Sequence, residues 1–260
     1  MTGSVPLDML LLFAGGLAAG GLGGLLGIGG GIVLIPLLRF GADLPPALAA
    51  GTCIVAVFFT TLGGSWRHHR AGQLRVPPLI PVLVTGAVAT ALFSTLFTTL
   101  AVRGTWMDRA MAAVFALVSV RMLWEGLRRS PEASEGRTAG PGVDLLRKGT
   151  IGVAGGLLPG LLGIGTGGIL VPAFSFWLRM PVKAAVAGSL LCFCLNAGIS
   201  ASFKLAQGFV VLELVPALAL GTFLGADLGA RLNGRFRSRA IKLLFGLVFT
   251  YVSIRLATTG

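Results

Sequence analysis

The chain has 260 residues, of which 55% are hydrophobic and 12% are charged, and its mean hydropathy is +0.89. A soluble domain carries about 25% charged residues, so this composition excludes an ordinary soluble fold. The formal net charge of +12 does not indicate a nucleic-acid partner, because membrane proteins concentrate Lys and Arg in their cytoplasmic loops. We therefore predict an integral membrane protein that is surrounded by the lipid bilayer and binds no nucleic acid.

Long charge-free runs supply the membrane segments. A helix needs roughly 20 apolar residues to cross a bilayer, and the cost of unpaired backbone groups in lipid leaves only helices or closed barrels. The runs are Met9 to Leu38, Leu44 to Trp66, Val76 to Val102, Gly149 to Leu178 and Ala184 to Phe203. They are too long and too continuously apolar for barrel strands. The pattern predicts an all-α polytopic membrane protein whose first run is a retained membrane segment, not a signal peptide.

The sequence repeats itself at an offset of 136 residues. Gly24 to Pro36 (GLLGIGGGIVLIP) aligns without a gap with Gly160 to Pro172 (GLLGIGTGGILVP), and nine of thirteen positions are identical. Self-similarity on this scale indicates two copies of one structural unit. We predict a first repeat at 1–128, a second repeat at 148–260, and an exposed linker at 129–147 that is rich in Ser, Pro, Gly and charge.

Each repeat opens with a Gly-rich segment whose path decides the topology. In the first repeat this segment, about 6–40, precedes three clear helices at about 46–66, 76–101 and 107–127. It either crosses the membrane once or turns back on itself, which gives four or five passes per repeat. Four passes divide the Lys and Arg residues outside helix interiors ten to ten between the two faces, whereas five passes divide them fifteen to five.

Loop charge favours five passes, because the positive-inside rule expects a strong bias. The poor face then holds Arg39, Arg103, Arg109, Lys204 and Arg255. Five segments per repeat make the two repeats inverted, with both termini in the periplasm and the linker in the cytoplasm. About 35 residues leave fewer than 20 for each limb of the Gly-rich segment, so that segment is predicted to be broken or re-entrant.

The breaks are predicted among Gly20 to Gly31 and among Gly155 to Gly168, with Pro36 and Pro172 ending or kinking the second limbs. A half-helix that starts inside the membrane presents free N–H groups and a positive dipole end, which favour an anion, and transporters place such ends at the bilayer midplane. Close helix packing is the alternative role for glycines spaced by four. The candidate substrate-binding glycines are Gly27, Gly29, Gly30, Gly31, Gly163, Gly165 and Gly167.

A few polar residues inside apolar segments are further candidates. Thr52 and Ser189 follow paired glycines, and the Asn196 amide is harder to satisfy within its own helix. Such groups can donate hydrogen bonds to an oxyanion, or they can bond their own helix backbone. His68 and Lys204 share one repeat position, where they either line the two mouths of a path as a gate or snorkel to the lipid headgroups.

The duplicated motif, GIGGGxxxxP and GIGTGxxxxP, resembles that of the TauE/SafE sulfite exporter family of bacterial membrane transporters. The resemblance covers nearly the whole chain and implies a multi-pass protein of the bacterial inner membrane. It also implies a small anionic substrate that contains sulfur, such as sulfite or an organosulfonate. The family motif falls on the glycines named above, with Thr166 in place of one glycine. This replacement either adds a hydroxyl to the candidate site or keeps the second copy of the motif further from the ligand.

We therefore predict a secondary transporter that exports a sulfur-containing anion by alternating access. The alternative is a transporter or channel for another small organic or inorganic anion. An enzyme is not expected, because no HExxH motif is present and the two histidines are the adjacent His68 and His69. No cofactor or metal is predicted. The identity of the anion, the direction and coupling of transport, and the oligomeric state stay open.

Overall fold

A computed structural model describes residues 5–27, 29–74, 76–101, 104–127, 141–232 and 238–259, and within these ranges it contains helices and no strand. The first half contains α1 (Val5–Leu26), α2 (Gly31–Pro36), η1 (Leu37–Gly41), α3 (Pro46–Arg70), η2 (Pro77–Leu79), α4 (Ile80–Ala101) and α5 (Gly104–Leu127). The second half contains α6 (Pro141–Leu162), α7 (Gly167–Pro172), η3 (Ala173–Trp177), α8 (Val182–Ala206), α9 (Val215–Leu232) and α10 (Ser238–Thr259).

The two halves follow the same order of elements. In each half a 22-residue helix breaks, a six-residue helix ends at a proline, and one π-helical turn leads to a 25-residue helix. The proline therefore ends the α-helical part of each second limb, as its missing N–H requires. The match extends to unusual backbone angles, because Asp43 and Arg179, 136 residues apart, both have φ of 53°.

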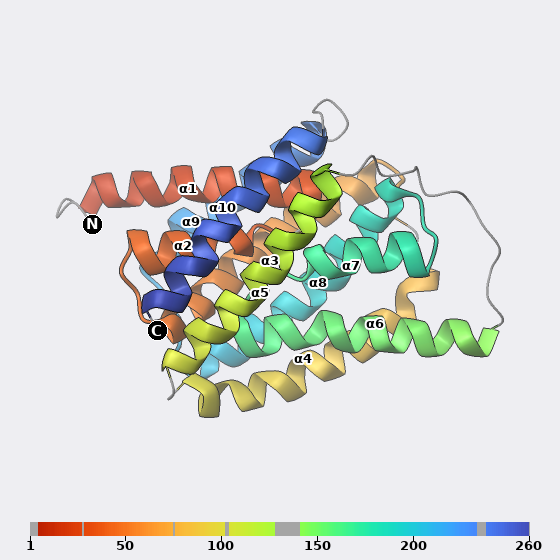
Figure 1. The fold of residues 1–260 in the computed structure, drawn as a ribbon, viewed down its shortest axis with the longest axis horizontal. Helices are drawn as coiled ribbons and strands as arrows, with labels where there is room; N and C mark the ends of the chain where they lie inside the picture. Colours follow the sequence, from red (N-terminus) through yellow and green to blue (C-terminus); the bar gives the residue numbers. More distant parts are fainter. Residues whose placement is uncertain are drawn as a thin grey trace.

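Helices from the two halves pair with each other. Helix α1 packs along α9, α6 packs along α4, and α5 packs along α10, while α3 and α8 contact each other at the centre. Helices α1 and α6 run in opposite directions, and so do α5 and α10 (Figure 1). The start of α1 and the end of α10 lie at one end of the molecule, and the start of α6 lies at the other (Figure 1).

Small residues form the contact between α1 and α9. A Cβ atom on Gly20 or Gly24 of α1 would overlap the backbone of Thr222 or Ala226. Gly221, Gly225 and Gly229 are equally close to the backbone of α1. This spacing lets two membrane helices approach closely, so these glycines serve helix packing.

Four helical segments are long and apolar enough to cross a membrane: Pro46–Arg70, Pro77–Thr99, Lys183–Ala206 and Val215–Leu232. Shorter apolar helices cover Met9–Leu25 and Gly31–Gly41. Helix α4 exposes Val84, Val88 and Leu92 along one face, each more than half exposed. An apolar stripe of this kind is stable where lipid covers it. The fold is therefore that of a multi-pass helical membrane protein.

Candidate functional site

The first break lies at residues 27–30, between α1 and α2, within the predicted Gly20 to Gly31. Gly27, Gly29 and Gly30 have φ of 70°, 80° and 75°, a left-handed conformation that residues with a side chain rarely adopt. A Cβ atom on Gly30 would lie 2.7 Å from the carbonyl oxygen of Ala19. The chain therefore turns back and places α2 against α1, as the length of the Gly-rich segment requires.

The second break lies at residues 163–166, between α6 and α7, within the predicted Gly155 to Gly168. Gly163 has φ of 65°, but Thr166, the residue that precedes α7, has a right-handed φ of −98°. A Cβ atom on Gly155 would lie 2.9 Å from the side chain of Leu170, so α7 also folds back on α6. The two copies of the motif thus share a path but differ in backbone conformation.

The structure brings the two breaks together. A Cβ atom on Gly31 would lie 3.0 Å from the backbone nitrogen of Gly165. A Cβ atom on Gly27 would lie 2.9 Å from the side chain of Val186 in α8, and one on Gly163 would overlap the backbone of Ala50 in α3. Each break therefore packs against the central helix of the other half. Close packing accounts for these glycines, so evidence for a ligand has to come from polar groups.

Thr166 provides such a group at the second break. Its side chain is fully buried, and its Oγ1 atom has no hydrogen-bond partner among the described residues. The hydroxyl also does not cap α7. A buried polar group without a partner costs about 1–3 kcal/mol, which a ligand oxygen can recover. Gly165 precedes it and Gly167 begins α7, so the hydroxyl belongs to the segment that meets the first break.

The other polar candidates divide between the breaks and the surrounding helices. Ser189 Oγ donates to the carbonyl of Gly27 at 3.2 Å, so it lies at the first break. Thr52 Oγ1 accepts the N–H of Val211 at 3.0 Å, and therefore holds the segment between α8 and α9 instead of a break. The structure brings Ser189 to the candidate site and directs the Thr52 hydroxyl elsewhere.

Asn196 compensates for a proline inside α6. Pro159 has no N–H, so the carbonyl of Gly155, four residues earlier, loses its donor within the helix. Asn196 Nδ2 supplies a donor to that carbonyl at 3.2 Å. Its Oδ1 atom is buried without a partner in the described part of the chain. Asn196 therefore supports the helix that leads into the second break.

Neither His68 nor Lys204 lies at an open mouth. Lys204, grouped with the loop charges by the sequence pattern, is fully buried beneath the end of α6. His68 is 3% exposed, its Nδ1 atom lies 2.8 Å from Gln73 Oε1, and its buried Nε2 atom has no partner in the described ranges. No group of three His, Cys, Asp or Glu side chains among the described residues could hold a metal ion.

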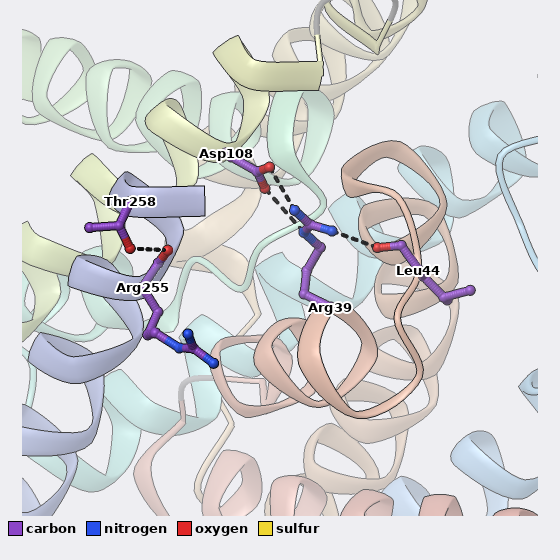
Figure 2. Close-up of polar contacts among 5 residues, drawn as sticks. All are labelled: Arg39, Leu44, Asp108, Arg255 and Thr258. Carbon is purple, nitrogen blue, oxygen red and sulfur yellow. Dashed lines mark hydrogen bonds and ion pairs between the residues drawn. The ribbon is translucent and has the colours of Figure 1, made fainter. Parts of the chain in front are cut away.

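One buried ion pair was not predicted. Arg39, assigned by its charge to a periplasmic loop, donates from Nε and Nη2 to the two carboxylate oxygens of Asp108 at 3.1 and 2.6 Å, and from Nη1 to the carbonyl of Leu44 at 2.8 Å (Figure 2). The side chains are 14% and 6% exposed. The pair ties η1 to α5. The equivalent repeat positions are Ser175, at the offset of 136, and Ser238, at an offset of 130 that also aligns Arg109-Ala110 with Arg239-Ala240. Two serines cannot form such an ion pair.

Comparison with known proteins identifies the family. The model of the family described as sulfite exporter TauE/SafE matches residues 12–256. The chain belongs to the TauE/SafE family. It is 27% identical to "Probable membrane transporter protein YunE" of Bacillus subtilis, over 98% of this chain and 99% of the relative. No solved structure matches.

A second relative is a "Probable membrane transporter protein" of Haemophilus influenzae, 29% identical over 82% of this chain and 79% of the relative. The TauE/SafE protein described here is therefore a membrane transporter and not an enzyme.

Proposed function

We propose that this TauE/SafE protein is a secondary transporter that exports a small sulfur-containing anion, sulfite or an organosulfonate, by alternating access. The observation that carries the proposal is the buried hydroxyl of Thr166, which has no hydrogen-bond partner among the described residues. This hydroxyl belongs to the segment where the two breaks meet, since Gly31 approaches the backbone nitrogen of Gly165. The description of the family model supports the cargo class.

The proposed architecture consists of two inverted repeats of five membrane segments, at 1–128 and 148–260. Two observations support it. Helices α1 and α6 run in opposite directions, and each packs along a helix of the other half, α1 along α9 and α6 along α4 (Figure 1). Loop charge supports a cytoplasmic linker at 129–147 and periplasmic termini in the bacterial inner membrane. Transporters of this design hold their substrate where the repeats meet.

In the proposed mechanism, donors from the two breaks replace part of the hydration shell of the anion. These donors are the hydroxyl of Thr166 and the backbone N–H groups at the starts of α2 and α7, which have no acceptor within their own helices. A rocking of one half against the other then exposes the bound anion to the opposite side. An inside-negative potential favours anion exit by about 2.3 kcal/mol per charge at 100 mV, so export needs no ATP.

The test is anion flux in liposomes that contain the purified protein. Sulfite, sulfoacetate, sulfate and acetate, together with taurine as a sulfonate of no net charge, would be compared for the wild type, Thr166→Val and Thr166→Ser. We expect saturable flux of a sulfur-containing anion, reduced about tenfold to a hundredfold in Thr166→Val and largely kept in Thr166→Ser, because a hydrogen bond to a charged group contributes about 1.5–3 kcal/mol.

Thr90→Val is the matched control, since Thr90 is equally buried but its hydroxyl bonds the carbonyl of Gly156, away from the breaks. It should transport normally once folded. Normal flux in Thr166→Val would show that the Thr166 hydroxyl, and with it the second break, does not bind the anion. Flux confined to acetate would contradict the sulfur-anion assignment, and no flux of any of the five would contradict the proposed export of a sulfur-containing anion.

A further inference from the structure

Lys204 is a buried lysine whose Nζ atom has three hydrogen-bond acceptors around it, an arrangement that matches the three donors of an ammonium group. Its Nζ atom donates to the carbonyls of Pro159 and Gly160 at 3.1 and 2.9 Å and to Ser200 Oγ at 2.8 Å. The same atom lies 4.2 Å from the centre of the Phe97 ring. Among the described residues no carboxylate forms an ion pair with it. The Lys204 ammonium group is therefore stabilised by the dipoles of two carbonyls and one hydroxyl and by the face of the Phe97 ring.

The acceptors of Lys204 lie at the end of α6. This helix ends at Leu162, so its last four carbonyls, Pro159 and Gly160 among them, have no donor within the helix. The negative end of a helix dipole corresponds to about half an elementary charge, so a full positive charge placed there leaves a net positive end. Gly160 lies three residues before the break at Gly163, which is about 5 Å along a helix.

The first half has no such charge. The repeat equivalents of Pro159 and Gly160 are Gly23 and Gly24, and the carbonyl of Gly23 accepts the N–H of Gly29 at 3.5 Å. The repeat equivalent of Lys204 is His68, whose Nδ1 atom contacts Gln73 instead of the end of α1. The second break, which also carries Thr166, therefore follows a helix whose last carbonyls accept hydrogen bonds from Lys204, and the equivalent residue His68 makes no such contact in the described part of the first half.

We infer that Lys204 is a positioning residue that gives the second break the positive potential by which the transporter selects an anion. This inference rests on the proposed function, because it names the source of charge selectivity of that same site. Lys204 holds the end of α6 in place and acts on the substrate through space. The matching class of ligand is a small oxyanion, bound more tightly as its negative charge increases.

A purely structural cap has to be separated from a charge effect. Lys204→Gln keeps amide donors for the carbonyls of α6 but removes the charge, whereas Lys204→Met removes both. A cap requires only the donors, so Lys204→Gln would then behave like the wild type. Lys183→Gln is the matched charge control, because Lys183 is an exposed residue near the other end of the same helix.

The measurement is flux of sulfate and methanesulfonate, a divalent and a monovalent probe, in proteoliposomes at fixed ionic strength. We expect Lys204→Gln to fold and to lower the apparent affinity about tenfold per substrate charge, so that sulfate loses more than methanesulfonate. Lys183→Gln should leave both affinities and their ratio unchanged. An unchanged ratio in a folded Lys204→Gln protein would overturn the inference but not the proposed function. If the wild type transports neither sulfate nor methanesulfonate, both the inference and the proposed binding of such oxyanions are wrong.

Discussion

The two breaks have nearly the same sequence but different chemistry. The first has three left-handed glycines: Gly27 and Gly29 pack against α8 of the other half, and Gly30 packs against α1. In the second, Thr166 replaces one of those glycines with a right-handed residue whose buried hydroxyl has no partner among the described residues, and Lys204 bonds the end of the preceding helix. The two copies thus share the path of the chain, but in the described structure they differ in backbone conformation and in the polar groups around them.

Substitution of Gly30 should give the largest effect on stability. Gly30→Ala combines a left-handed φ of 75° with a Cβ atom 2.7 Å from a backbone oxygen, so we expect a loss of about 3 kcal/mol or failure to fold. Thr166→Ala, at the equivalent repeat position, should lose less than about 1 kcal/mol. Unfolding in detergent measures both variants, and equal losses would show that the two breaks do not differ in backbone strain.

Loss of the buried ion pair should give the next largest difference between the two halves, because it affects η1 and not η3. Asp108→Ala leaves Arg39 without its partner carboxylate and should cost about 3 kcal/mol. The double variant Arg39→Leu/Asp108→Leu should cost less, since it leaves no buried charge. Hydrogen exchange should quicken in η1 after Asp108→Ala and remain unchanged in η3, which has no such pair. Equal changes in η1 and η3 would contradict a role of the ion pair that is confined to the first half.

Substitutions at Asn196 and Pro159 should change stability less, and the effect of one should depend on the other. Asn196→Ala should cost about 1–2 kcal/mol, because the carbonyl of Gly155 then has no donor. Pro159→Ala restores a backbone N–H to that carbonyl, so Asn196→Ala should cost less in this background. A double-mutant cycle on unfolding free energies measures the coupling. Strict additivity would show that Asn196 does not compensate for Pro159.

The smallest effect on stability is expected at Thr166, whose hydroxyl has no hydrogen-bond partner among the described residues. Thr166→Val should leave the unfolding free energy unchanged or raise it slightly, although it reduces transport. Thr222→Val should lower stability by about 1 kcal/mol, because Thr222 Oγ1 donates to the carbonyl of Ala56 at 3.0 Å. A large loss in Thr166→Val would mean that its hydroxyl has a structural partner.

The repeat, both breaks and the reversal of the chain at each break could be predicted from the sequence, because they depend on nearby glycines and prolines and on the length of the Gly-rich segment. The four-residue spacing of Gly221, Gly225 and Gly229 indicates helix packing, but it does not identify α1 as the partner helix. The sequence pattern places Asn196 inside an apolar segment and Lys204 at a membrane face, yet their carbonyl acceptors lie 41 and 44 residues away in the chain. Arg39 and Asp108 are 69 residues apart, and no local pattern links them.

The central claim is that the two breaks form one anion site, and a bound anion tests it most directly. Selenite has the shape and charge of sulfite, and its selenium atom is located by anomalous diffraction from crystals grown with it. We predict a single selenium position within hydrogen-bond distance of Thr166 Oγ1 and the Gly165 backbone nitrogen, and its loss in Thr166→Val. Selenium bound elsewhere, or no bound selenium under conditions where sulfite is transported, would contradict the account.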